Sequence, residues 1–187
     1  MSKIRLTPNA SGTGTVTLTV PSTNTDRTIS LPDSAGEIVT NESTPIFAAY
    51  LGSTQSIGSG VFTKLNIDTE VVDSEGWYDH TTNYRFTPQQ AGYYFVEGMV
   101  YYQFMQNNVA VPRVYKNGSA AGGVTFNRFQ ATSSITDAEC GGCGIVYANG
   151  STDYFELYAF QDYGSNRNVY NGGSWATRFS GYLIKAT

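Results

Sequence analysis

The sequence has few charged side chains and no long apolar run. Charged residues make up 14% of the 187 residues, well below the roughly 25% of an average soluble protein, and the net charge is -4. The Lys and Arg residues are scattered, which argues against general nucleic-acid binding, because phosphate contacts need clustered basic side chains. No apolar run approaches the roughly 18 residues that a membrane helix needs, and the first residues lack the apolar stretch of a secretory signal. We therefore expect a protein made in a cytoplasm, without an export signal of its own and without membrane insertion.

Cysteine and histidine are also scarce: Cys140, Cys143 and His80 are the only residues of their kinds. The CxxC spacing is typical of a redox pair or half of a zinc site. A redox pair usually begins a helix, which we do not detect here, and a zinc site needs two more Cys or His ligands. The sequence favours two buried thiols that act as small apolar residues. It contains neither a G-x-S-x-G motif nor a partner for a Cys nucleophile, so we expect no catalysis, cofactor or metal.

Aromatic residues are absent from residues 1–46, and this absence divides the chain. Within this segment, TVTLTV (15–20) and RTISL (27–31) alternate polar and apolar residues, as strands do. The segment has too few large apolar residues to form a core alone, so it must stay flexible or lie on another surface. We expect residues 1–44 to form an extended, β-rich docking arm. The arm's expected contact residues are Ile4, Leu6, Val16, Leu18, Val20, Ile29 and Leu31.

From Pro45 onward the sequence predicts only strands. Stretches rich in aromatic and β-branched residues alternate with turn residues, and KNGS (116–119) and ANGST (148–152) are typical of hairpin turns. Many short strands with regular turns are typical of a sandwich or barrel. The expected strands are 45–51, 62–67, 83–87, 92–104, 109–116, 123–130, 143–148, 153–161 and 177–185.

The stretch GYYFVEGMVYYQF (92–104) has two apolar faces, because side chains alternate between the two sides of a strand. One face consists of Tyr94, Val96, Gly98, Val100, Tyr102 and Phe104. The other consists of Tyr93, Phe95, Glu97, Met99 and Tyr101. A half-exposed strand should show only one apolar face, so the second face needs a cover, either within the subunit or from another subunit.

Four segments follow one another in a recognisable order: PIFAAYLG, RFTPQQAGYYFV, the hairpin AECGGCGIVYANGSTDYFELYAF, and FSGYLI. They resemble the opening strand, the most recognisable segment, the later hairpin and the closing strand of the complement globular head and tumour necrosis factor superfamily. The resemblance implies that residues 45–187 form a homotrimeric jelly-roll sandwich of about ten antiparallel strands. It also implies that the second face of 92–104 packs against neighbouring subunits around a threefold axis. The implied axis residues are Tyr93, Phe95, Glu97, Met99, Tyr101, Phe179 and Leu183.

Glu97 is the charged residue among these positions. Around a threefold axis, its three copies could bind a cation, pair with a basic residue or meet water in an axial channel, and the sequence leaves these alternatives open.

The arm sequence TVTLTVPSTNTDRTISLPDSAGEIVT has a Thr-rich strand followed by LPD-x-x-G. It is similar to the short β-repeat segments that begin many bacteriophage fibre and virion proteins. Together with a trimeric head, this resemblance implies a non-catalytic structural protein of a phage virion. We expect a capsid decoration or head-fibre protein that binds other virion proteins through residues 1–44.

Two alternatives remain at this stage. The protein could be a tail-fibre tip or adhesin that binds a host surface glycan or protein, or a soluble ligand-binding module of the complement type. For an adhesin, the loop 161–177 is the favoured surface, because it mixes aromatic rings with amides and a charge. Its candidate contact residues are Tyr163, Arg167, Tyr170 and Trp175.

Overall fold

The computed structural model describes residues 44–134, 137–172 and 176–187, with positions 11–15, 17, 22, 24–26 and 28 near the N-terminus. The chain divides into two compact units, Met1–Glu37 and Ile38–Thr187, whereas composition predicted a boundary after residue 44. Outside the described residues lie Trp175 and the predicted arm contacts Ile4, Leu6, Val16, Leu18, Val20, Ile29 and Leu31.

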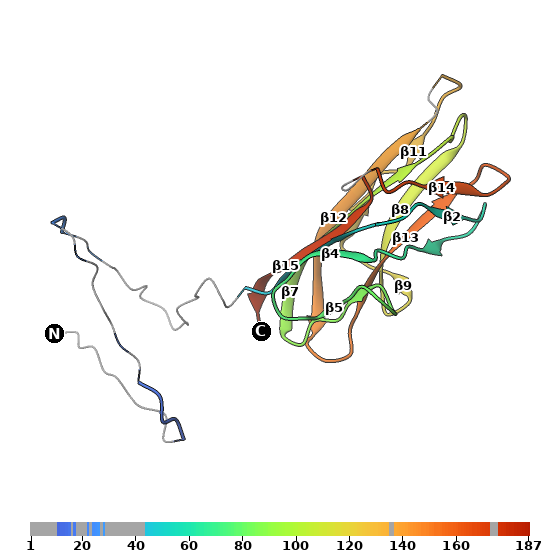
Figure 1. The fold of residues 1–187 in the computed structure, drawn as a ribbon. Coiled ribbons are helices and arrows are strands. Elements are labelled where there is room, and N and C mark those ends of the chain that lie inside the picture. The colour runs from blue at the N-terminus through green and yellow to red at the C-terminus, as the bar shows by residue number, and fades with distance from the viewer. Residues whose placement is uncertain are drawn as a thin grey trace. The chain divides into compact units, whose positions relative to one another are not determined.

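The second unit is an all-β sandwich of two antiparallel sheets, as predicted (Figure 1). Its strands are β1 (Ile46–Tyr50), β2 (Gln55–Ile57), β3 (Thr63–Lys64), β4 (Thr69–Asp73), β5 (Tyr78–Asp79), β6 (Arg85–Phe86), β7 (Ala91–Tyr102), β8 (Val109–Lys116), β9 (Ser119–Ala120), β10 (Val124–Phe126), β11 (Phe129–Gln130), β12 (Ala138–Asn149), β13 (Phe155–Gln161), β14 (Arg167–Val169) and β15 (Arg178–Ala186). The described residues contain no helix, and hence none that is long and apolar enough to cross a membrane.

The larger sheet has the strand order β10–β12–β7–β15–β1–β4, and β14 joins it by pairing with β7 and β2. The smaller sheet has the order β11–β8–β13–β6–β5, with β3 beside β13 and β9 beside β8. Strands from both halves of the chain therefore lie side by side in each sheet.

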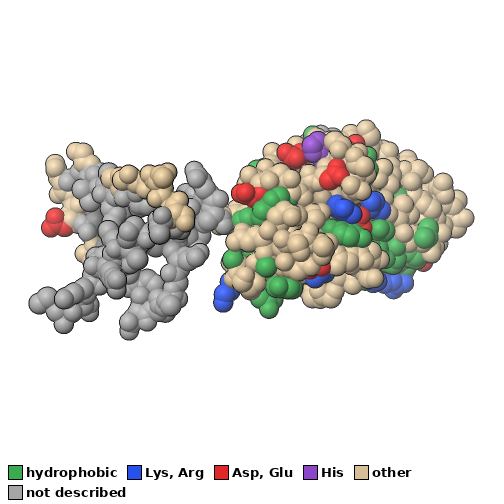
Figure 2. All heavy atoms as spheres, turned by 90° about the horizontal axis from the view of Figure 1, so that it is seen from below, with side chains coloured by type: hydrophobic (Ala, Val, Ile, Leu, Met, Phe, Trp, Pro, Cys, Tyr) green, Lys and Arg blue, Asp and Glu red, His purple; other side chains and the backbone are tan. Residues whose placement is uncertain are grey.

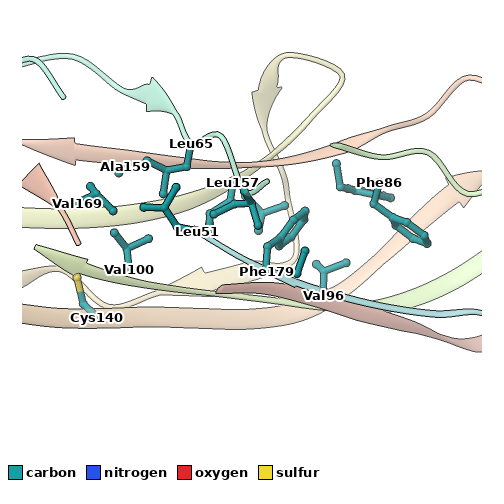
Figure 3. Close-up of a cluster of buried hydrophobic side chains, with 14 of the residues drawn as sticks. Leu51, Leu65, Phe86, Val96, Val100, Cys140, Leu157, Ala159, Val169 and Phe179 are labelled. Atoms are coloured by element: carbon teal, nitrogen blue, oxygen red, sulfur yellow. The ribbon is translucent and has the colours of Figure 1, made fainter. Parts of the chain in front are cut away.

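The core lies between the two sheets. The predicted inward face of β7 is confirmed, because Tyr94, Val96, Val100 and Tyr102 are fully buried. Figure 3 shows Val96 and Val100 in the same cluster as side chains of the smaller sheet. Gly98 lies on this face because the sheets approach closely there: a Cβ at Gly98 would come 2.4 Å from Leu157 Cδ1.

The outward placement of Phe179 and Leu183 was wrong. β15 pairs with β7 so that Phe179 stands opposite Gly98 and Leu183 opposite Tyr94. Directly opposed residues of neighbouring strands point to the same face, and this is the core face of β7. Phe179 is accordingly 0% exposed and its ring lies 5.0 Å from that of Phe47.

The predicted burial of both thiols was half right. Cys140 is buried and Cys143 is exposed, because residues three apart on β12 point to opposite faces. Burial raises the pKa of the Cys140 thiol to about 12. β12 is also longer than the predicted 143–148, because the glycines that precede Cys143 belong to the strand. Glycine is needed there because β10 lies close: a Cβ at Gly142 would come 1.9 Å from Thr125 O.

The sandwich has two ends, which lie at opposite ends of β7. At the entry end, the chain enters the sandwich through Pro45, whose carbonyl accepts the Leu183 N–H, and the C-terminal Thr187 N–H donates to Ala91 O. The far end carries the loop that follows Tyr102 and the loop that follows β13.

Candidate association surface on the outer face of the larger sheet

The outer face of the larger sheet carries a row of apolar side chains at right angles to the strands. Ile145 of β12 stands opposite Phe95 of β7, Phe95 opposite Tyr182 of β15, and Tyr182 opposite Ile46 of β1. The adjacent row places Tyr147 opposite Tyr93. We call these residues the outer apolar patch: Ile46, Tyr93, Phe95, Ile145, Tyr147 and Tyr182.

The outer apolar patch is exposed in a single subunit. Ile145 is 55% exposed, and Tyr93, Tyr147 and Tyr182 are each close to 45%. Figure 2 shows hydrophobic side chains in separate groups among polar ones on the face of the sandwich that it views. Contiguous exposed apolar side chains of this kind mark sites of association.

The rings within the patch already contact one another. Phe95 and Tyr182 have ring centroids 5.3 Å apart, and Tyr93 and Tyr147 have centroids 5.6 Å apart. Because these pairs are formed within one subunit, little side-chain freedom remains to be lost when a second surface covers them.

An ion pair borders the patch in the next row of the sheet. Arg178 Nε lies 3.5 Å from Glu97 Oε1, and Glu97 stands between Cys143 and Ser180 on the neighbouring strands. The sequence left a cation, a basic residue or water as partners of Glu97, and the structure shows a basic residue of the same subunit.

The far part of the same face is more covered. The Tyr101 hydroxyl donates to Asp137 Oδ2 at 2.8 Å, and the rings of Tyr101 and Tyr170 lie 5.7 Å apart. The hydrogen bond to Asp137 and burial together raise the pKa of Tyr101. Thus Tyr101 and Met99 lie on the predicted outward face, but Tyr101 is already packed against its own chain.

In the described part of the loop 161–177, the candidate contact residues of an adhesin take different partners. The Arg167 guanidinium stacks on Tyr163, 3.1 Å from the ring centroid, and its Nε donates to Phe104 O at 2.9 Å. Tyr170 instead packs on Tyr101 at the outer face. The structure therefore separates Tyr170 from the pair formed by Tyr163 and Arg167.

Phe104, at the far end, is held in an unusual conformation. Its φ is 59°, a left-handed value that a bulky residue rarely adopts, and its side chain is 56% exposed. Its N–H donates to Asp137 Oδ1 and its carbonyl accepts from Arg167 Nε. Two charged residues thus hold the backbone of Phe104, whose aromatic ring is exposed at this end.

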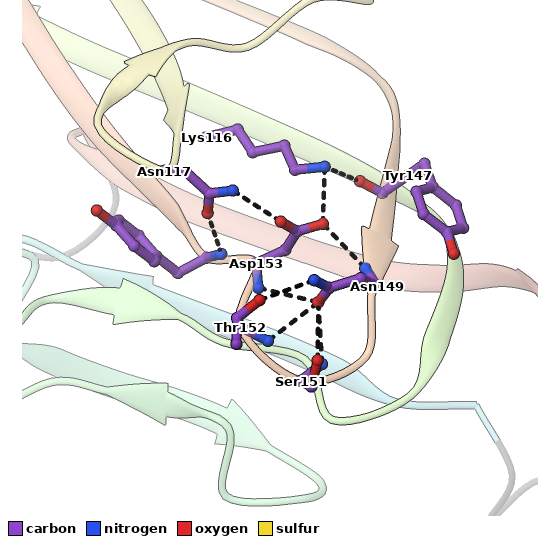
Figure 4. A network of polar contacts seen from close by, with 8 residues as sticks. Lys116, Asn117, Tyr147, Asn149, Ser151, Thr152 and Asp153 are labelled. Carbon is purple, nitrogen blue, oxygen red and sulfur yellow. Dashed lines mark hydrogen bonds and ion pairs between the residues drawn. The ribbon is translucent and has the colours of Figure 1, made fainter.

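A polar network at the entry end contacts the backbone of Tyr147, a residue of the outer apolar patch (Figure 4). Lys116 Nζ lies 2.8 Å from Asp153 Oδ2 and donates to Tyr147 O at 2.8 Å. Asn117 Nδ2 and the Asn149 N–H donate to the same carboxylate. Burial by itself raises the pKa of Asp153, but these hydrogen bonds outweigh it and hold the pKa below its ordinary value.

Sequence reasoning missed the patch residues outside β7. The signal was present in IVYA (145–148), where Ile145 and Tyr147 alternate with buried residues, and in the phase of FSGYLI. The sequence alone does not tell which alternate residues of FSGYLI face outward. The register of β15 against β7 decides this, and it places Tyr182 rather than Phe179 on the outer face.

The architecture is a TNF-like jelly roll. Murine APRIL is similar to the sandwich with a TM-score of 0.55 at 11% identity, over 75% of this chain and 99% of that chain. Eiger TNF from S. frugiperda has a TM-score of 0.50 at 10% identity, over 77% of this chain and 93% of that chain. PRD1 vertex protein P5 reaches a TM-score of only 0.45 at 12% identity, over 76% of this chain and 96% of that chain. No protein-family model matches the chain, and no curated protein does.

Proposed function

We propose that the protein is a non-catalytic structural component of a phage particle. In this proposal residues 45–187 form a trimeric head on the particle surface, and residues 1–44 anchor it to other virion proteins. The role of capsid decoration or head fibre fits best, because no long shaft sequence separates residues 1–44 from residues 45–187.

The outer apolar patch is the observation that carries this proposal. Tyr182 and its neighbours give one sheet face the rings and aliphatic groups that an interface core uses. We expect the patch to be covered by other copies of the same face, arranged around an axis. The reason is that β7, in the middle of this sheet, carries apolar side chains on its exposed side as well as on its core side. The arm's resemblance to phage repeat segments supports the particle location.

Removal of the arm tests the division of labour. The intact protein should bind assembled phage shells at near-stoichiometric occupancy in a sedimentation assay. A chain that begins at Pro45 should stay folded and trimeric but no longer bind shells. Shell binding by the truncated chain, or loss of its trimer, would contradict the proposal.

Phe104 favours a second candidate function, a fibre tip that contacts the host. Phe104 combines an exposed ring with a strained backbone that Asp137 and Arg167 hold in place, and such strain is found at sites of function. It lies at the far end, away from the point where the chain enters the sandwich. A Phe104→Ala variant should then bind host cells less well than wild type, whereas a pure decoration role predicts equal binding.

A further inference from the structure

A hollow of about 360 Å³ opens at the entry end, between the β5–β6 hairpin and the turn that leads into β7. Its wall includes the side chains of Trp77, Asn83, Arg85 and Gln89. The volume is near the lower end of the roughly 300–1,000 Å³ typical of small-ligand sites. The hairpin belongs to the smaller sheet, so the hollow does not overlap the outer apolar patch.

The aromatic part of the wall is rigid. Trp77 packs on the core beside Phe86, with ring centroids 6.5 Å apart, and its carbonyl accepts the Thr87 N–H at 2.8 Å. The neighbouring Tyr78 is buried and donates its hydroxyl to Ile67 O at 2.9 Å. A ligand would therefore meet a preformed surface, which avoids an ordering cost on binding.

The polar groups of the wall have unused hydrogen-bonding capacity. The Arg85 guanidinium lies 4.4 Å above the Tyr154 ring, and no hydrogen bond or ion pair joins it to any described residue. Asn83 and Gln89 each use the NH₂ of the side-chain amide in a bond to a neighbour, while no described residue donates to either amide oxygen. The wall thus offers both N–H donors and carbonyl acceptors, which suits hydroxyl groups because they donate and accept.

The charges of the wall do not favour an acidic ligand. Asp79 accepts hydrogen bonds from the Thr82 and Thr81 N–H groups and from Asn83, and these hold its pKa well below its usual range. Burial raises the pKa of the neighbouring Tyr78, and the charges of Asp68, Asp79 and Glu70 raise it further. Among the described residues that line the hollow, Arg85 is the cation and Asp79 the anion, so the wall offers an added carboxylate or sulfate no excess of positive charge.

We propose that this hollow binds a neutral saccharide. The C–H face of a sugar ring packs against Trp77, while Arg85, Asn83 and Gln89 hydrogen-bond its hydroxyl groups. This proposal does not depend on the protein's place in a phage particle.

A glycan array probed with the intact protein tests the ligand class. We expect signals from neutral glycans built of hexoses and N-acetylhexosamines and weaker signals from sialylated or sulfated ones. No binding to any neutral glycan, or a preference for the acidic ones, would overturn the proposal.

Variants locate the site. For the best neutral glycan, titration calorimetry should show about 5- to 10-fold weaker binding for Arg85→Ala and for Gln89→Ala, because each loses one hydrogen-bonding group. Arg113→Ala is the matched control, since Arg113 also stacks on a ring, 4.9 Å from the Phe62 centroid, but does not line the hollow. Unchanged binding in both folded test variants, or an equal loss in Arg113→Ala, would exclude this hollow as the site. Trp77 is left intact because it packs on the core.

Discussion

Tyr182 lies in the outer apolar patch, and its replacement by alanine should separate association from folding. The residue is 45% exposed in one subunit. A fully buried aromatic side chain covers about 150–250 Å², so association can cover roughly 90 Å² more of Tyr182 in each subunit. At about 25 cal/mol per Å², this area corresponds to about 2 kcal/mol.

The effect on association is smaller than the area suggests, since ordering and desolvation take part of the gain. If half of the area term survives, three symmetric copies lose about 3 kcal/mol, and the trimer association constant falls roughly 150-fold. Sedimentation equilibrium over a dilution series of intact Tyr182→Ala protein measures this fall directly.

Two comparison variants make the result interpretable. Val61→Ala removes a similarly exposed side chain, 54% exposed, from a loop near the far end, and should associate like wild type. Phe179→Ala empties a core position and should cost about 3–5 kcal/mol of folding free energy in chemical denaturation. If Tyr182→Ala associates as tightly as Val61→Ala, the outer apolar patch is not the interface.

Three further predictions concern the polar network and the thiols. Asn117→Ala should lower the free energy of unfolding by about 2 kcal/mol in urea denaturation, because it removes two side-chain hydrogen bonds and a residue that tolerates a φ of 53°. Asp153 has a lowered pKa, so its stabilising effect is complete above about pH 5 and lost as pH falls through that pKa. The stability difference between wild type and Asp153→Asn should therefore shrink as the pH falls, and a difference that stays constant throughout the acid titration would refute the assignment. Iodoacetamide should modify Cys143 before Cys140, as peptide mass spectrometry can show, because Cys140 is buried and its pKa is raised to about 12.

The sequence predicted the class of fold and the two faces of β7, because both follow from the alternation of side chains along a strand. It could not place Phe179 correctly, because both faces of FSGYLI carry large apolar residues. Only the pairing of Phe179 with Gly98 decides which face is buried. Among the strands that it missed, β2 and β14 have three residues each, and their sequences show no apolar alternation. Their pairing depends on the loops at the far end.

The candidate site was predicted in part for the same reason. Tyr93 and Phe95 belong to a strand whose pattern is strong, whereas Ile46 joins them only through the strand order β7–β15–β1. The loop 161–177 was read as one surface, but the side chains of Arg167 and Tyr170 take different partners. Tertiary contacts of a loop are not encoded in a local pattern.

The most direct test of the account is the mass of the intact protein in solution, measured by light scattering. A trimeric head predicts three times the mass of the 20.3 kDa chain at micromolar concentration. The mass of a single chain would mean that the outer apolar patch is left uncovered or is covered by another molecule, and would contradict the proposed trimeric head.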